Sequence, residues 1–285
     1  MVNWAYYHQY PWGISGIHDD FQTDDSNYDG SEDADTDKTN IEEIHHNAKL
    51  ALPTQTITFD EIVPFDQNKL KDLRMVNPFR MEMVQKYEAA VNDMIQKEFY
   101  GDVYSKILYL RARIGSYVNK YHLSNVEKVK LILRICQPNN IVYEYDANCE
   151  ELYKGLDDNN PLLQKGKGFV EYCRFPTETI HDKRGDCDCH AAFAAALFAA
   201  CGFRSCFAIG NVGEDNDSAD HAMCGIECTP ELNAFRRTDN SFKKDGMNFI
   251  LLETVGMFDI EEVMEYQQKM SQKNTSVVIE PYREQ

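Results

Sequence analysis

Between residues 67 and 136, apolar side chains recur every three to four positions, which is the spacing of one face of an α-helix. The pattern predicts helices over 79–98, 102–122 and 124–137. At the start of the last helix, Ser124 and Glu127 stand three residues apart, as in a capping box. Pro78 precedes the first helix, whose apolar positions are Met81, Val84, Tyr87, Ala90 and Met94.

From residue 203 onward the apolar period changes to two, which is typical of half-buried strands. Strands are expected over 203–212, 221–228, 248–255 and 275–281, with an earlier strand over 139–146. A polar loop is expected over 229–247 and a helix over 259–270. The fold class is therefore α+β, and no internal repeat is present.

The segment 187–201 is apolar nearly all round, which indicates a buried central helix. Gly202 follows it at the position that favours a C-cap glycine. Together with the periodicity, this helix suggests three parts: an N-terminal arm over 1–50, a helical region over 51–121 and a core over 122–285.

The net charge of −18 is placed unevenly along the chain. Half of it lies before the first basic residue, Lys38, in an acidic segment that we expect to be flexible or bound to a partner protein. The "DADTD" run within it is not a calcium loop, because Lys38 and Ile44 replace the required glycine and glutamate. The sequence has no cluster of basic residues that could neutralise the phosphates of a nucleic acid. The acidic residues are Asp19, Asp20, Asp24, Asp25, Asp29, Glu32, Asp33, Asp35 and Asp37.

The chain shows no sign of a membrane span or a signal peptide. Its longest apolar run, 191–203, is shorter than the about 20 residues that a bilayer requires. The N-terminus lacks the basic and apolar regions of a signal peptide. The nine cysteines, an odd number, favour reduced thiols in a cytoplasm-like compartment or in a larger assembly.

Cys187 is the strongest candidate for chemistry. It follows Gly185 and Asp186 at the first position of the buried helix, where unpaired backbone N–H groups and the helix dipole favour a thiolate. A zinc site and a redox pair both compete with this reading, but no CxxC spacing is present. The other alternative is that the cysteines are simply buried core residues. This alternative explains Cys187 poorly, because Cys187 lies between two aspartates. It explains four other cysteines well: Cys201, Cys206, Cys224 and Cys228.

A thiol nucleophile needs a base, and the base needs an orienting group. His181 and His190 lie near Cys187 in the sequence. His221 opens the strand 221–228, on the side opposite to the apolar positions that suit a core. Glu253 is an acid in an otherwise apolar strand, and a buried carboxylate requires a partner such as an imidazole.

The order "FPTETI…RGDCDCHAAFAAALFAACGF…DHAMCGIE…FILLETV" resembles the transglutaminase-like superfamily of papain-like cysteine enzymes. The resemblance covers about 122–256. It implies a papain-like core in which the cysteine helix packs on an antiparallel sheet. It also implies Cys187 as nucleophile, His221 as base and Glu253 as orienting acid. Met223 and Cys189 depart from the family pattern, and the long loop 229–247 keeps Asp259 as a reserve for the acid.

These residues lead to a hypothesis of acyl transfer at an amide or peptide bond, with a protein or peptide as substrate and no metal or cofactor. Water as acceptor would make the enzyme a peptidase or amidase, and a lysine amine would make it a crosslinking transferase. The helix-start N–H is one candidate oxyanion donor, and Tyr172 is another. The alternative is a non-catalytic scaffold that docks in a larger particle, such as a virion or envelope complex, through its N-terminal arm.

Overall fold

The computed structural model describes residues 59, 65–81, 86–136, 140–146, 172–210, 221–236, 241–255 and 275–284. All of them belong to one compact unit, 52–285. The N-terminal arm, the helix expected over 259–270 and the reserve acid Asp259 lie outside the described residues.

The described secondary structure begins with a run of helices and ends with the strands of the main sheet. The helices are α2 Gln67–Met75, α3 Pro78–Met81, α4 Tyr87–Tyr100, α5 Ile107–Tyr121, α6 Asn125–Cys136, α9 Pro176–Asp182, α10 Cys187–Ala200 and the 3₁₀ helix η4 Pro230–Phe235. The strands are β1 Val142–Tyr143, β2 Arg184–Gly185, β3 Ser205–Gly210, β4 His221–Glu227, β5 Ser241–Lys244, β6 Met247–Leu252 and β7 Thr275–Ile279.

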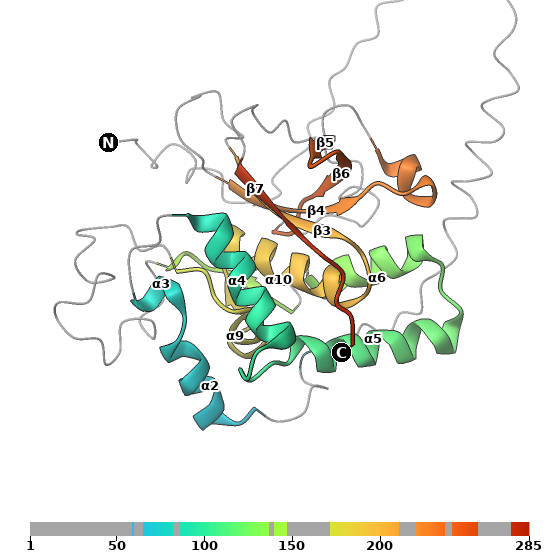
Figure 1. The fold of residues 1–285 in the computed structure, drawn as a ribbon. Coiled ribbons are helices and arrows are strands. Elements are labelled where there is room, and N and C mark those ends of the chain that lie inside the picture. Colours follow the sequence, from blue (N-terminus) through green and yellow to red (C-terminus); the bar gives the residue numbers. More distant parts are fainter. Residues whose placement is uncertain are drawn as a thin grey trace, which may run out of the picture. The chain divides into compact units, whose positions relative to one another are not determined.

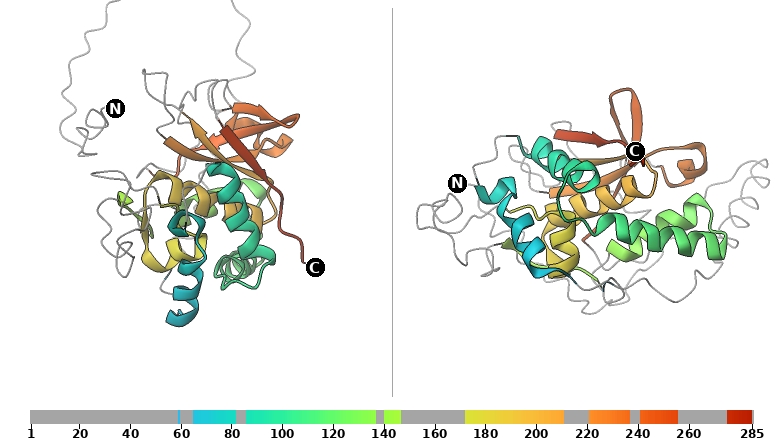
Figure 2. Two further views of the ribbon diagram at one scale, coloured as in Figure 1. Left: turned by 60° about the vertical axis from the view of Figure 1, so that its left-hand side comes forward. Right: turned by 60° about the horizontal axis from the view of Figure 1, so that its bottom comes forward.

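A five-stranded sheet has the order β5-β6-β4-β3-β7, and every neighbouring pair in it is antiparallel. Helices α10, α4, α5 and α6 lie on one side of this sheet (Figures 1 and 2). The α+β class expected from the sequence is therefore confirmed.

Helix α10 runs through the interior, between the sheet and the other helices (Figure 1). Its residues from Asp188 to Ala200 are all buried, as its apolar composition predicts. Its end is a Schellman motif: the N–H of Gly202, at φ +91°, donates to Ala199, and the N–H of Phe203 donates to Phe198. Within the described residues, no helix is both long and apolar enough to cross a bilayer.

The two faces of the sheet carry different side chains, as the period-two pattern predicts. Ala222, Cys224 and Ile226 of β4 join the main core beneath α10. Met223 points the other way and packs with Leu251 in a small separate cluster. The alternation in the sequence therefore gives the correct orientation of β4.

The capping box at α6 also forms as expected. The backbone N–H of Ser124 donates to Oε2 of Glu127 at 2.7 Å, and the N–H of Glu127 donates to the Ser124 hydroxyl at 3.3 Å. Two orphan N–H groups at the start of α6 are therefore paired.

Three elements differ from the sequence-based expectation. The single helix expected over 79–98 is two helices, α3 and α4. The strand expected over 139–146 is reduced to β1, which pairs in parallel with β2. The loop expected over 229–247 contains η4 and β5. A turn at Asp245 and Gly246, both at positive φ, joins β5 to β6.

Candidate active site

The two residues before Cys187 determine how α10 begins. Gly185 allows a close approach, because a Cβ there would lie 2.4 Å from the Cβ of Cys189. Asp186 takes the N-cap position with an extended backbone, but its side chain makes no capping hydrogen bond. The first N–H groups of α10 are therefore not capped by Asp186, and Cys187 is partly buried beside them.

His221 and Glu253 meet through strand pairing. His221 begins β4 and lies opposite Gly210 of β3. Glu253 follows the last residue of β6, and β6 pairs with β4 through Cys224 and Leu252. The register brings Nε2 of His221 within 2.9 Å of Oε2 of Glu253.

The Glu253 carboxylate is held from two sides. While Oε2 pairs with His221, Oε1 accepts the backbone N–H groups of Thr254 at 2.8 Å and Val255 at 3.0 Å. Burial would raise the pKa of Glu253, but the charge and hydrogen bond of His221 and these N–H groups lower it below its ordinary value.

The pKa of His221 moves in the opposite direction. Burial would lower the pKa of the imidazole, but the Glu253 carboxylate and the nearby Cys187 thiol outweigh burial and raise it well above 6.5. The thiol of Cys187 therefore lies near the ring that Glu253 holds. Of the three residues that the sequence singled out, His221 and Glu253 are in direct contact, and the assignment of all three to one catalytic site stays a prediction.

Tyr143 is a neighbour of the thiol that sequence reasoning did not assign. Burial raises the pKa of its hydroxyl, and the charges of Cys187 and Asp186 raise it further. The position follows from β1, because Tyr143 pairs in register with Gly185 just before α10. The tyrosine of the "IVY" run was visible in the sequence, but the short parallel pairing that places it was not.

The two aspartates on either side of Cys187 have side-chain pKa values well above the ordinary value. Burial raises the pKa of Asp186 to about 6, even though Arg174 opposes the shift. Burial also raises the pKa of Asp188 to about 6. The Tyr87 hydroxyl donates to Asp188, so the first turn of α10 is attached to the start of α4.

Cys189 serves the structure of this region rather than its chemistry. It is fully buried, and burial raises the pKa of its thiol well above the ordinary value. Its sulfur accepts from the backbone N–H and Nη1 of Arg174, both at 3.4 Å, and its S–H donates to the Tyr172 carbonyl at 3.5 Å. A neutral thiol in such a setting is a packing and hydrogen-bonding group.

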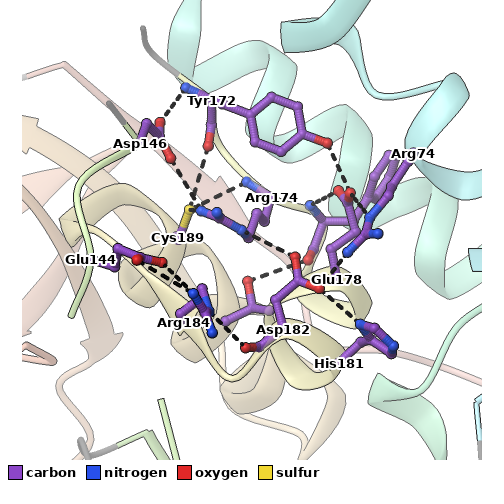
Figure 3. Close-up of polar contacts among 12 residues, drawn as sticks. Arg74, Glu144, Asp146, Tyr172, Arg174, Glu178, His181, Asp182, Arg184 and Cys189 are labelled. Carbon is purple, nitrogen blue, oxygen red and sulfur yellow. Dashed lines mark hydrogen bonds and ion pairs between the residues drawn. The ribbon is translucent and has the colours of Figure 1, made fainter. Parts of the chain in front are cut away.

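Arg174 is the centre of a buried network behind the start of α10 (Figure 3). Its side chain is 0% exposed. Nη1 pairs with Asp146 at 3.1 Å, and Nε pairs with Asp182 at 3.4 Å. The pairing satisfies a buried charge that would otherwise be costly.

The Pro-x-Glu-Thr segment is also structural. Glu178, in the first turn of α9, accepts the N–H of the N-cap residue Phe175 at 2.8 Å. It also accepts the Tyr172 hydroxyl at 2.8 Å (Figure 3), and Asn77 donates to it at 2.9 Å. The proposed role of Tyr172 as an oxyanion donor is therefore wrong, because its hydroxyl is committed to Glu178 in the interior.

One group of residues within the described ranges has metal-ligand spacing. Ligand atoms of Asp146, Asp186 and Cys189 lie within 4.8 Å of one another. However, the Arg174 guanidinium already donates to Asp146 and Cys189. A cationic side chain at this position disfavours a second cation, so these residues do not fit a metal ion.

The other two histidines near Cys187 are engaged elsewhere. Nδ1 of His181 pairs with Asp182 at 2.8 Å, and its ring packs edge-on against Phe65. His190 is buried, and its Nδ1 bonds the Thr254 carbonyl at 3.0 Å.

Comparison with known proteins gives little further information. No family model matches the chain, and no curated protein matches it significantly. A solved structure described as "Crystal structure of a TGase" is similar, with a TM-score of 0.29 and 14% identity. The match covers 83% of this chain and 41% of that chain, so this chain spans less than half of its length. Similarity at this level transfers no property from that structure.

Proposed function

We propose that this protein is a transglutaminase-like thiol enzyme that cleaves an amide or peptide bond in a protein or peptide substrate. The observation that carries the proposal is the 2.9 Å contact between His221 and Glu253, with the Cys187 thiol near enough to the same ring to raise its pKa. A nucleophile, a base and an orienting acid in this order are the requirements of covalent acyl transfer.

In the first step, the Cys187 thiolate attacks the substrate carbonyl and forms a C–S bond. The imidazolium of His221 gives its proton to the leaving amine as the C–N bond breaks. Nε2 of His221 is bound to Glu253, so Nδ1 is the nitrogen that exchanges the proton. Backbone N–H groups at the start of α10 stabilise the oxyanion.

In the second step, an acceptor attacks the acyl-thioester and His221 takes its proton. Water as acceptor releases a carboxylic acid and regenerates the thiol, so the reaction is hydrolysis. We favour hydrolysis over transfer to a lysine amine, because water reaches the site without a second binding surface. A peptidase or amidase is the resulting assignment.

The transglutaminase-like fold is part of the same proposal. Its support is the motif order in the sequence together with the observed elements: a buried helix that begins at Cys187, a following strand that begins at His221, and Glu253 after β6. This order supports a common position for the three groups, at one end of α10 and of the antiparallel sheet.

A thiol-directed activity probe tests the proposal. We expect it to label Cys187 in the wild type, to fail on Cys187→Ser and to label His221→Ala far more slowly. Cys228→Ser is the matched control, because Cys228 is the other partly exposed cysteine among the described residues. That variant should label like the wild type. Equal labelling of wild type and Cys187→Ser would overturn the proposed enzymatic activity and would favour the non-catalytic scaffold as the function.

A further inference from the structure

His190 occupies an unusual position in the molecule. It lies one turn beyond Cys187 on α10, and its side chain is 0% exposed. Nδ1 faces the Thr254 carbonyl at 3.0 Å, and since a carbonyl only accepts, Nδ1 carries the hydrogen. Nε2 is buried, and although the backbone of Cys136 lies near it, it makes no hydrogen bond within the described part of the chain.

The protonation of His190 is fixed by its surroundings. Burial lowers its pKa to about 4, although the carbonyl of Thr254, the charge of Glu253 and the backbone of Cys136 oppose the shift. Arg174 lowers it further. The ring is therefore neutral near pH 7 and cannot replace His221 as the base.

The contact with Thr254 connects His190 to Glu253. The N–H of Thr254 donates to Oε1 of Glu253, whose Oε2 pairs with His221. The short segment 253–255 is therefore attached to α10 by His190 and to β4 by His221. One hydrogen bond thus connects the helix that carries the thiol with the segment that carries the acid.

The need to fill space in the core does not explain why a histidine is found at position 190. An aliphatic side chain would fill the space without burying an unpaired nitrogen, and an unpaired buried polar atom costs stability. Only a side chain with a hydrogen-bond donor at the place of Nδ1 can hold the Thr254 carbonyl.

We propose that His190 is a positioning residue, which holds the segment 253–255 against α10 so that Glu253 orients His221 toward Cys187. This inference rests on the proposed function and adds a fourth residue to its machinery. His190 itself touches neither the reacting sulfur nor the substrate in the mechanism described above.

Two variants separate the hydrogen bond from the volume of the ring. His190→Leu removes the donor, while His190→Asn keeps an N–H near the place of Nδ1. The rate of alkylation of Cys187 by iodoacetamide is measured against pH by mass spectrometry of the Cys187 peptide. Circular dichroism and thermal unfolding report whether each variant is folded.

We expect His190→Leu to lower the alkylation rate at neutral pH by about tenfold to a hundredfold, because misplacement of an orienting group by an ångström has effects of this size. NMR titration should show the pKa of His221 falling toward 6.5, because Glu253 no longer holds the ring. His190→Asn should retain most of the wild-type rate and the raised pKa of His221.

The outcomes distinguish this inference from the proposed function. If alkylation of Cys187 in the wild type is unaffected by His221→Ala, the proposed function fails regardless of His190. If His221 and Glu253 control alkylation but a folded His190→Leu keeps the wild-type pH profile, the positioning role is overturned and the enzyme stands. If His190→Leu does not fold, a folded His190→Asn with a lost pH profile would overturn it equally.

Discussion

At the scale of single residues, Gly185 determines how closely α10 can begin against the segment before it. Any side chain there would meet Cys189, which is itself held by Arg174. Gly115 offers a contrast, because it lies inside α5 and a Cβ there would have nothing within 4 Å.

We therefore expect Gly185→Ala to lower the free energy of unfolding by about 1–3 kcal/mol, the usual cost of an overpacked interior site. Gly115→Ala should raise it by about 0.5–1 kcal/mol, because alanine is the better helix former. Urea unfolding of both variants measures the two changes. Similar stability of both variants would contradict the close approach at Gly185.

Single residues also show which parts of the candidate site can be recognised from the sequence. Cys187, His221 and Glu253 could be singled out from the sequence, because each belongs to a short motif with its own periodicity or helix-start signal, and the contact of His221 with Glu253 agrees with that choice. Their catalytic roles stay predictions. Arg174 could not be predicted as a buried residue, since its partners Asp146 and Asp182 come from separate segments and the chain holds many aspartates. His190 was noted only as a neighbour of Cys187, and its link to Thr254 depends on the tertiary fold.

At the scale of elements, a buried acid attaches α9 to α4. Glu98 accepts the N–H and the hydroxyl of Thr177, both at 2.7 Å, and the hydroxyl of Ser105 at 3.0 Å. Thr177 lies in the first turn of α9, where backbone N–H groups need partners. Burial raises the pKa of Glu98 from 4.5 to about 7, although these hydrogen bonds oppose the shift.

The raised pKa of Glu98 makes stability depend on pH. The folded state binds the proton more tightly than the unfolded state, so this contribution is complete below pH 4.5 and is lost as pH rises through about 7. Its full size is on the order of 3 kcal/mol. We expect wild type to lose stability relative to Glu98→Gln between pH 5 and 8, as measured by urea unfolding. Parallel stability curves would contradict this assignment.

Elements were predicted best where their signal is local. The capping box of α6, the closure of α10 at Gly202 and the alternation of β4 all depend on residues within a few positions. The hairpin strand β5 was missed because "SFKK" is polar for a strand, although Asp245 and Gly246 form a recognisable hairpin turn. The two-residue strands β1 and β2 exist only because distant segments meet.

At the scale of the whole described molecule, one core unites the helical region with the segment after it. Buried side chains of α4 and α5 belong to the same hydrophobic cluster as α10 and the sheet. Tyr282, which follows β7, donates its backbone N–H to the Ala199 carbonyl at 3.0 Å. The boundary expected near residue 121 therefore does not separate two cores. The shared residues include Val91, Met94, Ile95, Ile107, Leu110 and Ile114.

We predict that a fragment of residues 52–285 unfolds in one cooperative transition, whereas a fragment of 122–285 does not fold. Each large apolar side chain removed with α4 and α5 contributes about 1.5–3 kcal/mol, and domains have only about 5–15 kcal/mol in total. Near-UV circular dichroism and urea unfolding of the two fragments test this. A cooperative transition in the shorter fragment would show that 122–285 is an independent domain.

The position of β7 has a consequence for synthesis on the ribosome. β7 pairs with β3, although about seventy residues of translation separate them. While the ribosome makes those residues, the edge of β3 has no neighbour on that side, and its backbone groups can recruit a foreign strand. The nascent chain is therefore exposed to mispairing until Thr275–Ile279 leaves the exit tunnel, and slower translation between β6 and β7 would lengthen that period.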